Sequence, residues 1–213
     1  MIAPPVSDQP AVPEENRLYR TVADLAPELW TDVEERPLAF AARSAAARSE
    51  GRRVFIRFLG GDYLVDFEAR RITAPPAHRP AGFQKGLVLL TYLARAQDFG
   101  QAGRQVTARE LNGGDLFFQG PHALATAPVT DRFGADPDGF VLRAGELGLK
   151  PAPAGTAVSG SVLPHLTMGI ILHPADEEFP AELTYTFDAY AHHHMPLDGL
   201  WALVNVLAGE LAS

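Results

Sequence analysis

The stretch 52-RRVFIRFLGGDYLVDFEARRITA-74 changes the hydrophobic period of the chain to two. Val54, Ile56 and Phe58 stand at alternate positions, which is the pattern of a strand with one buried face. The glycine pair at 60–61 predicts a turn, and the segments DYLVDF and RRITA continue the chain back and forth. This stretch therefore predicts an antiparallel meander.

A second strand region is predicted at 156–188, from the segments TAVSGSVLPHL, TMGIILH and AELTYTFDAY. A strongly apolar helix follows each strand region, GFQKGLVLLTYLARAQ after the first and LDGLWALVNVLAGELA after the second. Segments 52–97 and 156–212 thus share one order of elements, which a distant internal duplication would explain. We predict an α+β fold with two mainly antiparallel strand regions, at about 52–74 and 156–188, and flanking helices.

Other segments predict further helices. RLYRTVADLAPELW carries an apolar stripe at helical spacing, and RPLAFAARSAAARSEG has Pro37 in its first turn and Gly51 as its stop. DPDGFVLRAGELGL predicts another helix, with Asp136 or Asp138 near its start. Residues 1–16 contain four prolines and predict a tail, so that 17–213 form a single domain with candidate halves 17–97 and 98–213.

Composition excludes several classes of function. The 213 residues include no cysteine, so the chain itself holds no disulfide, no thiolate-bound iron–sulfur cluster and no thiol nucleophile. The net charge of −8 argues against nucleic acid or an anionic membrane as partner, because both require a basic face. The longest apolar run, GLVLLTYLA, is too short to span a bilayer. We expect a soluble, cytoplasmic protein.

The segment 173-HPADEEFP-180 is the first candidate site. Clustered carboxylates repel one another, so that one pKa rises or a cation binds, and imidazole with carboxylates suits a divalent transition metal. The alternative is a charged hairpin loop or a docking surface for a partner protein, because turns favour Asp and Pro for local reasons. The residues of this candidate are His173, Asp176, Glu177 and Glu178.

The segment 191-AHHHMP-196 is the second candidate. In an extended chain His192 and His194 point to the same side and form a two-imidazole clamp, whereas in a helix neighbours lie about 100° apart. The alternative is a surface loop with adventitious metal affinity. If the TMGIILH and AELTYTFD strands pair, His173 and the histidine run lie at opposite ends of the hairpin, which opposes one site built from both.

Weaker signals concern anions. The glycines in LNGGD, Gly113 and Gly114, could form a backbone nest for an anion or simply a turn. Arg52 and Arg53, with a second arginine pair at 70–71, could bind an anionic ligand or solvate strand ends. Phenylalanines that could line an apolar pocket instead of the core are Phe117, Phe118, Phe133 and Phe140.

The chain contains four segments in the order GLVLLTYLARA, ELNGGDLFF, DRFG and LPHLTMGIILHPADEEFPAELTYTFDAYAHHHMPLD. In this order of segments the chain resembles family 3786 of the domains of unknown function. The resemblance covers roughly residues 38–212. It implies no established activity. It implies a link, in some members, with a cysteine-rich ferredoxin-like segment or with corrinoid-dependent one-carbon metabolism in anaerobes. This chain departs from the first feature, because it has no cysteine and a partner would have to supply any cluster.

Three hypotheses follow. The first is a non-catalytic accessory or binding domain with a protein partner in a redox or one-carbon enzyme system. The second is a metal-dependent enzyme that uses the histidine and carboxylate candidates, and the third is a small-molecule sensor with an apolar pocket. Convergence of the carboxylates with His192 and His194 in one cleft would favour the enzyme.

Overall fold

The computed structural model describes residues 19–74, 79–153 and 155–213, so the proline-rich tail predicted at 1–16 lies outside the described residues. The fold is α+β, as predicted, with two five-stranded antiparallel sheets. The first sheet has sequential order and contains β1 (Arg48–Glu50), β2 (Arg53–Phe58), β3 (Gly61–Asp66), β4 (Arg71–Ala74) and β5 (Arg79–Pro80). The second has the spatial order β6 (Gln105–Thr107), β10 (Glu182–Asp188), β9 (Leu166–His173), β8 (Thr156–Leu163) and β7 (Lys150–Pro151).

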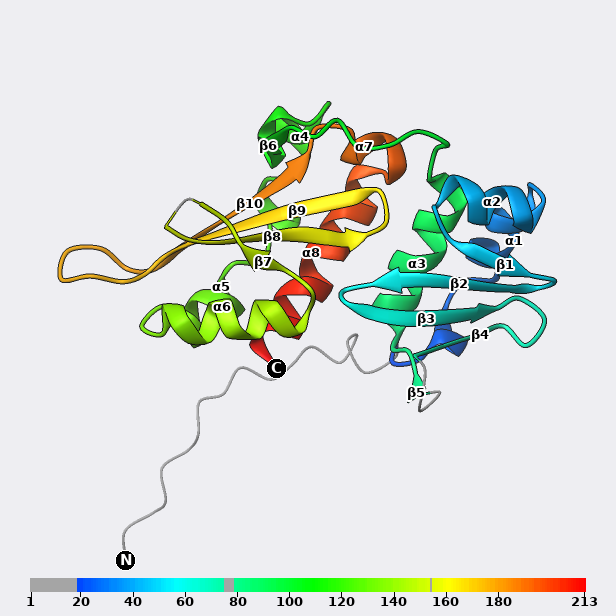
Figure 1. Cartoon of the computed structure of the whole chain (residues 1–213), viewed down its shortest axis with the longest axis horizontal. Helices are drawn as coiled ribbons and strands as arrows, with labels where there is room; N and C mark the ends of the chain where they lie inside the picture. The colour runs from blue at the N-terminus through cyan, green and yellow to red at the C-terminus, as the bar shows by residue number, and fades with distance from the viewer. Residues whose placement is uncertain (1–18, 75–78, 154) are drawn as a thin grey trace, which may run out of the picture.

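Two long helices form the centre of the molecule. Helix α3 (Phe83–Arg95) follows the first sheet and α8 (Leu197–Ala212) follows the second, and the two helices pack against each other. In Figure 1 each helix lies behind its own sheet. Their buried leucines belong to one contiguous apolar core that draws on both halves of the chain. The division into halves 17–97 and 98–213 stays a prediction.

The remaining helices are short. They are η2 (Val22–Asp24), α1 (Pro27–Glu34), α2 (Leu38–Ser44), η3 (Ala108–Glu110), α4 (Gly114–Phe117), η4 (Gly120–His122), α5 (Ala127–Phe133), α6 (Pro137–Glu146) and α7 (Ala191–His194). Helix α1 packs against α3. The carboxylate of Asp136 caps α6 by accepting a hydrogen bond from the Gly139 N–H at 3.0 Å, which confirms one of the two predicted starts.

Three local predictions were wrong. The helix predicted over 17–30 is two elements, because Pro27 starts a new helix after a 3₁₀ turn. The helix predicted up to Gly51 ends at Ser44, and Ala46 then adopts φ +49°, which turns the chain into β1. The turn predicted at Gly60–Gly61 is formed by Leu59 and Gly60, with φ +46° and +73°, while Gly61 already pairs with Phe58 in the sheet.

This β2–β3 hairpin reaches the second half of the molecule. The Leu59 N–H donates a hydrogen bond to the Val162 carbonyl at 3.0 Å, so β2 and β8 are joined. Gly60 lies against the backbone of Leu147, where an added Cβ would come within 2.8 Å of a carbonyl carbon. The hairpin tip therefore holds the two sheets together at one edge of their junction.

Candidate binding cleft

A cleft of about 720 Å³ lies at the junction of the two halves. Its walls come from the segment before η2, from β3 to β5, from the first turn of α3 and from the last two turns of α8. Pockets of this size commonly hold small molecules, and they occur preferentially between structural units. Its polar lining includes Arg20, Tyr63, Arg79, Lys85, Asn205 and Glu210.

An ion pair lies on the wall of the cleft. The ammonium of Lys85 lies 2.8 Å from the Glu210 carboxylate and also contacts the Tyr63 hydroxyl. Burial by itself lowers the pKa of Lys85, but the contacts with Glu210 and Tyr63 outweigh burial and leave that pKa raised. Lys85 is therefore a fixed cation whose charge Glu210 balances.

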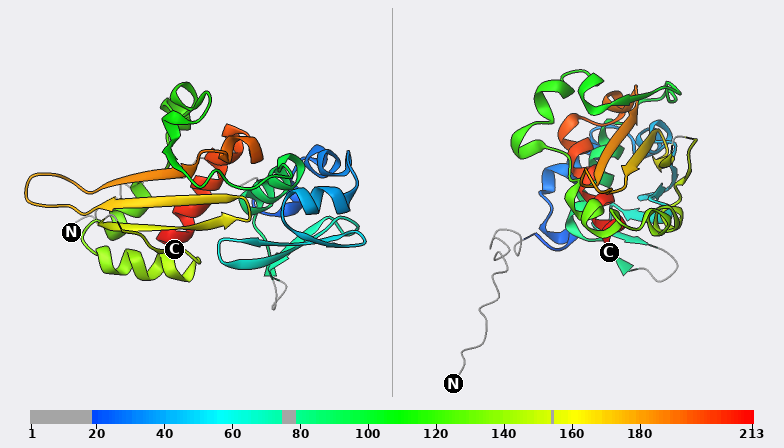
Figure 2. Two further views of the ribbon diagram at one scale, coloured as in Figure 1. Left: turned by 45° about the horizontal axis from the view of Figure 1, so that its top comes forward. Right: turned by 90° about the vertical axis from the view of Figure 1, so that its left-hand side faces the viewer.

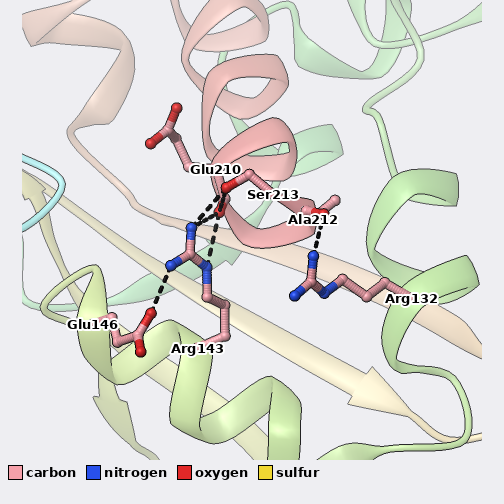
Figure 3. A network of polar contacts seen from close by, with 6 residues as sticks. All are labelled: Arg132, Arg143, Glu146, Glu210, Ala212 and Ser213. Carbon is pink, nitrogen blue, oxygen red and sulfur yellow. Dashed lines mark hydrogen bonds and ion pairs between the residues drawn. The ribbon is translucent and has the colours of Figure 1, made fainter.

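Figure 3 shows how the end of α8 is anchored. Arg143 of α6 donates two hydrogen bonds to the Glu210 carbonyl, from Nε at 3.1 Å and from Nη2 at 2.6 Å. Arg132 of α5 donates to the Ala212 carbonyl at 2.5 Å. Cations at a helix C-terminus satisfy its free carbonyls and its dipole. The two arginines thus fix the backbone that carries the Glu210 carboxylate into the cleft.

Two further cations stand at the cleft, and the Asp24 carboxylate near the first of them accepts a hydrogen bond from the Arg20 backbone N–H at 3.0 Å. Arg20 and Arg79 are exposed, and neither forms a salt bridge within the part of the chain that the structure describes. The first turn of α3 lies beside them and has no side-chain cap, and of its N–H groups that of Phe83 donates to the Arg20 carbonyl at 3.2 Å. Free N–H groups of a helix start and arginine side chains both favour an anion. The cleft is thus positive at its rim on a chain whose net charge is −8.

The acidic candidate lies far from this cleft. His173 ends β9, and Asp176, Glu177 and Glu178 stand exposed in the loop that connects β9 to β10. This loop extends away from the body in Figure 1 and in the left view of Figure 2. The Asp176 carboxylate accepts hydrogen bonds from the N–H groups of Glu178 at 2.8 Å and Phe179 at 2.7 Å, and these bonds lower its pKa.

The histidine run is a helical turn, α7, and not an extended segment, so the same-side geometry that an extended chain would give His192 and His194 does not apply. The backbone turns after Asp188, and His194 enters the core with none of its surface exposed while His193 remains exposed. The run and the acidic loop flank opposite ends of β10, as strand pairing predicted. Among the described residues no group of three or more His, Cys, Asp or Glu side chains could hold a metal ion.

The weaker anion candidates lie elsewhere as well. Gly113 has φ +77° and Gly114 begins α4, where its N–H already donates to the Leu111 carbonyl at 2.8 Å. Arg52 pairs with Glu34, and Arg53 pairs with Asp66 at 3.2 Å. The structure brings neither pair into the cleft, and an anion-binding role for them stays a prediction.

The phenylalanine candidates divide into two groups. Phe133 and Phe140 are buried and pack against each other in the core. Phe117 and Phe118 are only partly buried. Phe118 nevertheless packs against the core, so the interpretation in which these residues belong to the core applies to Phe118 as well as to the first pair.

Sequence reasoning missed the cleft residues and a buried polar cluster. Asp188 is 1% exposed, and its carboxylate accepts hydrogen bonds from the N–H groups of Ala102, Gly103 and Tyr190. One weak signal for the cleft was available: Asn205 interrupts the apolar run LWALVNVLAG.

A family comparison covers most of the chain. The model of the Domain of unknown function (DUF3786) matches residues 36–210. The chain belongs to this family. The resemblance inferred from the sequence over roughly 38–212 is thereby confirmed, and Arg79, Lys85, Asn205 and Glu210 fall within the matched range. No curated protein and no solved structure matches the chain. Among the described residues, no helix is long and apolar enough to cross a membrane.

Proposed function

We propose that this DUF3786 chain is a non-catalytic binding domain whose ligand is a small anionic molecule held in the junction cleft. One observation carries the proposal: Arg20 and Arg79 stand at the cleft, and neither guanidinium forms a salt bridge with a described carboxylate. Lys85 is already balanced by Glu210, so the two arginines supply the net positive charge that a ligand would neutralise. A cleft with walls of low dielectric concentrates that potential.

The protonation state of Lys85 favours binding over chemistry. A lysine that acts as base or nucleophile needs a lowered pKa, so that the neutral amine is populated near pH 7. Glu210 and Tyr63 raise the pKa of Lys85 instead. Lys85 then serves as a charged hydrogen-bond donor that orients a ligand or the Glu210 carboxylate.

We further propose that the domain is an accessory component of a redox or one-carbon (corrinoid-linked) enzyme system and acts with a protein partner. This part rests on the family resemblance alone. The cleft supports it only in that an accessory domain with a ligand site could report the level of an anionic metabolite to its partner.

Isothermal titration calorimetry with pyrophosphate and citrate tests the ligand class. We expect saturable binding that weakens as salt rises and that falls at least tenfold in the variant Arg20→Ala/Arg79→Ala. Arg109→Ala, an exposed arginine of η3 outside the cleft, is the matched control and should bind as the native chain does. Absence of binding by either anion, or equal loss in the control, would overturn the proposal.

A further inference from the structure

The wall that α8 presents to the cleft contains two residues that do not suit a helix. Asn205 and Gly209 stand four positions apart, and both line the cleft. Residues at this spacing lie on one face of a helix, one turn above the other. Glycine is the poorest residue for a helix interior after proline, and asparagine ranks well below alanine.

Packing does not require the glycine. A Cβ added at Gly209 would meet no heavy atom within 4 Å, and Gly209 has no positive φ that would demand glycine. By contrast, Gly199 at the start of the same helix has the Met195 side chain 2.6 Å from the position of an added Cβ. Gly199 is therefore explained by close packing, whereas Gly209 leaves an open notch beside Asn205 and Glu210.

The asparagine lies on the less buried stripe of α8, which also carries Asp198, Trp201 and Gly209, so its side chain can face the cleft. Its neighbours in α8, Val204 and Val206, are buried, and its amide has no hydrogen-bond partner among the described residues. A carboxamide offers both a donor and an acceptor. Such a side chain at the wall of a cleft can pair with a ligand edge that also carries one donor and one acceptor.

An aromatic pair completes the lining. The rings of Tyr19 and Phe83 lie with centroids 5.1 Å apart, and 58% of Tyr19 is exposed. Both residues line the cleft next to Arg20. Exposed aromatic faces bind planar rings by stacking.

We propose that the ligand is a nucleoside phosphate or a close chemical equivalent, a planar heteroaromatic ring with a phosphate group. Arg20 and Arg79 bind the phosphate, Asn205 pairs with the polar edge of the ring above the Gly209 notch, and the Tyr19–Phe83 pair stacks on its face. This inference rests on the proposed function. It adds that the anionic ligand also carries a planar ring.

The test compares three sets of probes by isothermal titration calorimetry. They are AMP, GMP, CMP and UMP, then ribose 5-phosphate as the anion without the ring, then the four nucleosides as the ring without the anion. We expect at least one monophosphate to bind tenfold or more tightly than ribose 5-phosphate. Equal binding of all phosphates would overturn the ring but leave an anion site. Failure of every phosphate, together with pyrophosphate and citrate, would overturn the proposed function itself.

Gly209→Ala separates a ligand role from a structural one. The alanine should raise the midpoint of thermal unfolding, because it fits without a clash and favours the helix, yet weaken the monophosphate at least fivefold by filling the notch. Gly145→Ala in α6 is the matched control, since its added Cβ also meets nothing within 4 Å and it lies outside the cleft. It should gain stability with unchanged binding. Unchanged binding in Gly209→Ala would overturn the proposal.

Asn205→Leu provides an independent check. Leucine continues the apolar face of α8 and should preserve the fold, which circular dichroism verifies. We expect a loss of preference among the four monophosphates, because the residue that reads the ring edge is gone, while ribose 5-phosphate binds as before. A variant that keeps the native preference would contradict the role of Asn205.

Discussion

The imidazole rings of His165 and His194 stack with their centroids 4.9 Å apart, which joins the turn between β8 and β9 to α7. The His165 N–H donates to the Tyr92 hydroxyl at 3.0 Å, and that hydroxyl donates to the Ala45 carbonyl at 3.2 Å. These contacts together connect the second sheet, through Tyr92 of α3, to the end of α2. They link the two halves at a site separate from the cleft.

The stability of the protein should fall with acid because of His194. Burial, and then the neighbouring His165, lower the pKa of His194 to about 4 from an ordinary 6.5. Between pH 6.5 and about 4 this histidine is protonated in the unfolded chain but neutral in the folded chain. The free energy of unfolding therefore drops by up to about 1.4 kcal/mol per pH unit as pH falls. Above pH 6.5 His194 contributes no pH dependence.

Urea unfolding at pH 7, 6, 5 and 4.5 measures this effect. His194→Phe keeps a buried ring and should flatten the profile. Because the pKa values of His165 and His192 are also lowered, some slope should remain. His173→Phe, at an exposed position at the end of β9 and outside this histidine cluster, is the control and should keep the native slope. A native slope in His194→Phe would show that other groups carry the acid sensitivity.

The buried carboxylate of Asp188 should be a principal determinant of stability. It accepts hydrogen bonds at 2.8 Å from both Ala102 and Gly103 and at 2.9 Å from Tyr190. Asp188→Ala leaves three backbone donors without their acceptor, at a cost of roughly 3 kcal/mol or more. Asp188→Asn keeps one oxygen and should cost less. Chemical denaturation provides both values, and a loss below 1 kcal/mol in the alanine variant would disprove this account.

Alanine substitutions at Gly60 and Gly51 distinguish the cost of backbone strain from the cost of a steric clash. Both have positive φ, +73° and +58°, so alanine at either position is strained by about 1–2 kcal/mol. At Gly51 the added Cβ meets nothing within 4 Å, whereas at Gly60 it comes within 2.8 Å of the Leu147 backbone. We expect Gly60→Ala to be the more destabilising variant in thermal unfolding, because the hairpin must move away from the second half. Equal effects would mean that the junction is more pliable than its contacts indicate.

Metal content tests the hypothesis of a histidine site. The His194 Nδ1 atom faces the Gln97 N–H at 3.4 Å, and the ring is fully buried. We therefore expect tag-free protein to contain no stoichiometric metal by mass spectrometry, before or after incubation with zinc, iron, nickel and cobalt salts. Near-stoichiometric metal that disappears in His192→Ala/His194→Ala would instead make the run a ligand set.

Much of the architecture follows from local pattern. Alternation at Val54, Ile56 and Phe58 predicts β2, and the apolar run around Leu89 predicts a helix buried on most sides, because both patterns reflect which face of an element leaves water. The pattern failed where a single residue ends an element. Pro27 divides one apolar stripe into two helices. After α2, Ala46 adopts a positive φ, which the residue type alanine does not predict.

The two strand regions, the apolar helix after each, the antiparallel pairing and the separation of the acidic loop from the histidine run are properties of the amino-acid sequence that local periodicity reveals. The short strands β1, β5, β6 and β7 are not among them, because two or three residues are too few to show a period. Tertiary structure alone decides the cleft. Arg20, Tyr63, Lys85 and Asn205 are far apart along the chain and belong to different elements. They converge because α3 and α8 bury their leucines against each other, and no local pattern specifies which residues meet at the end of that contact.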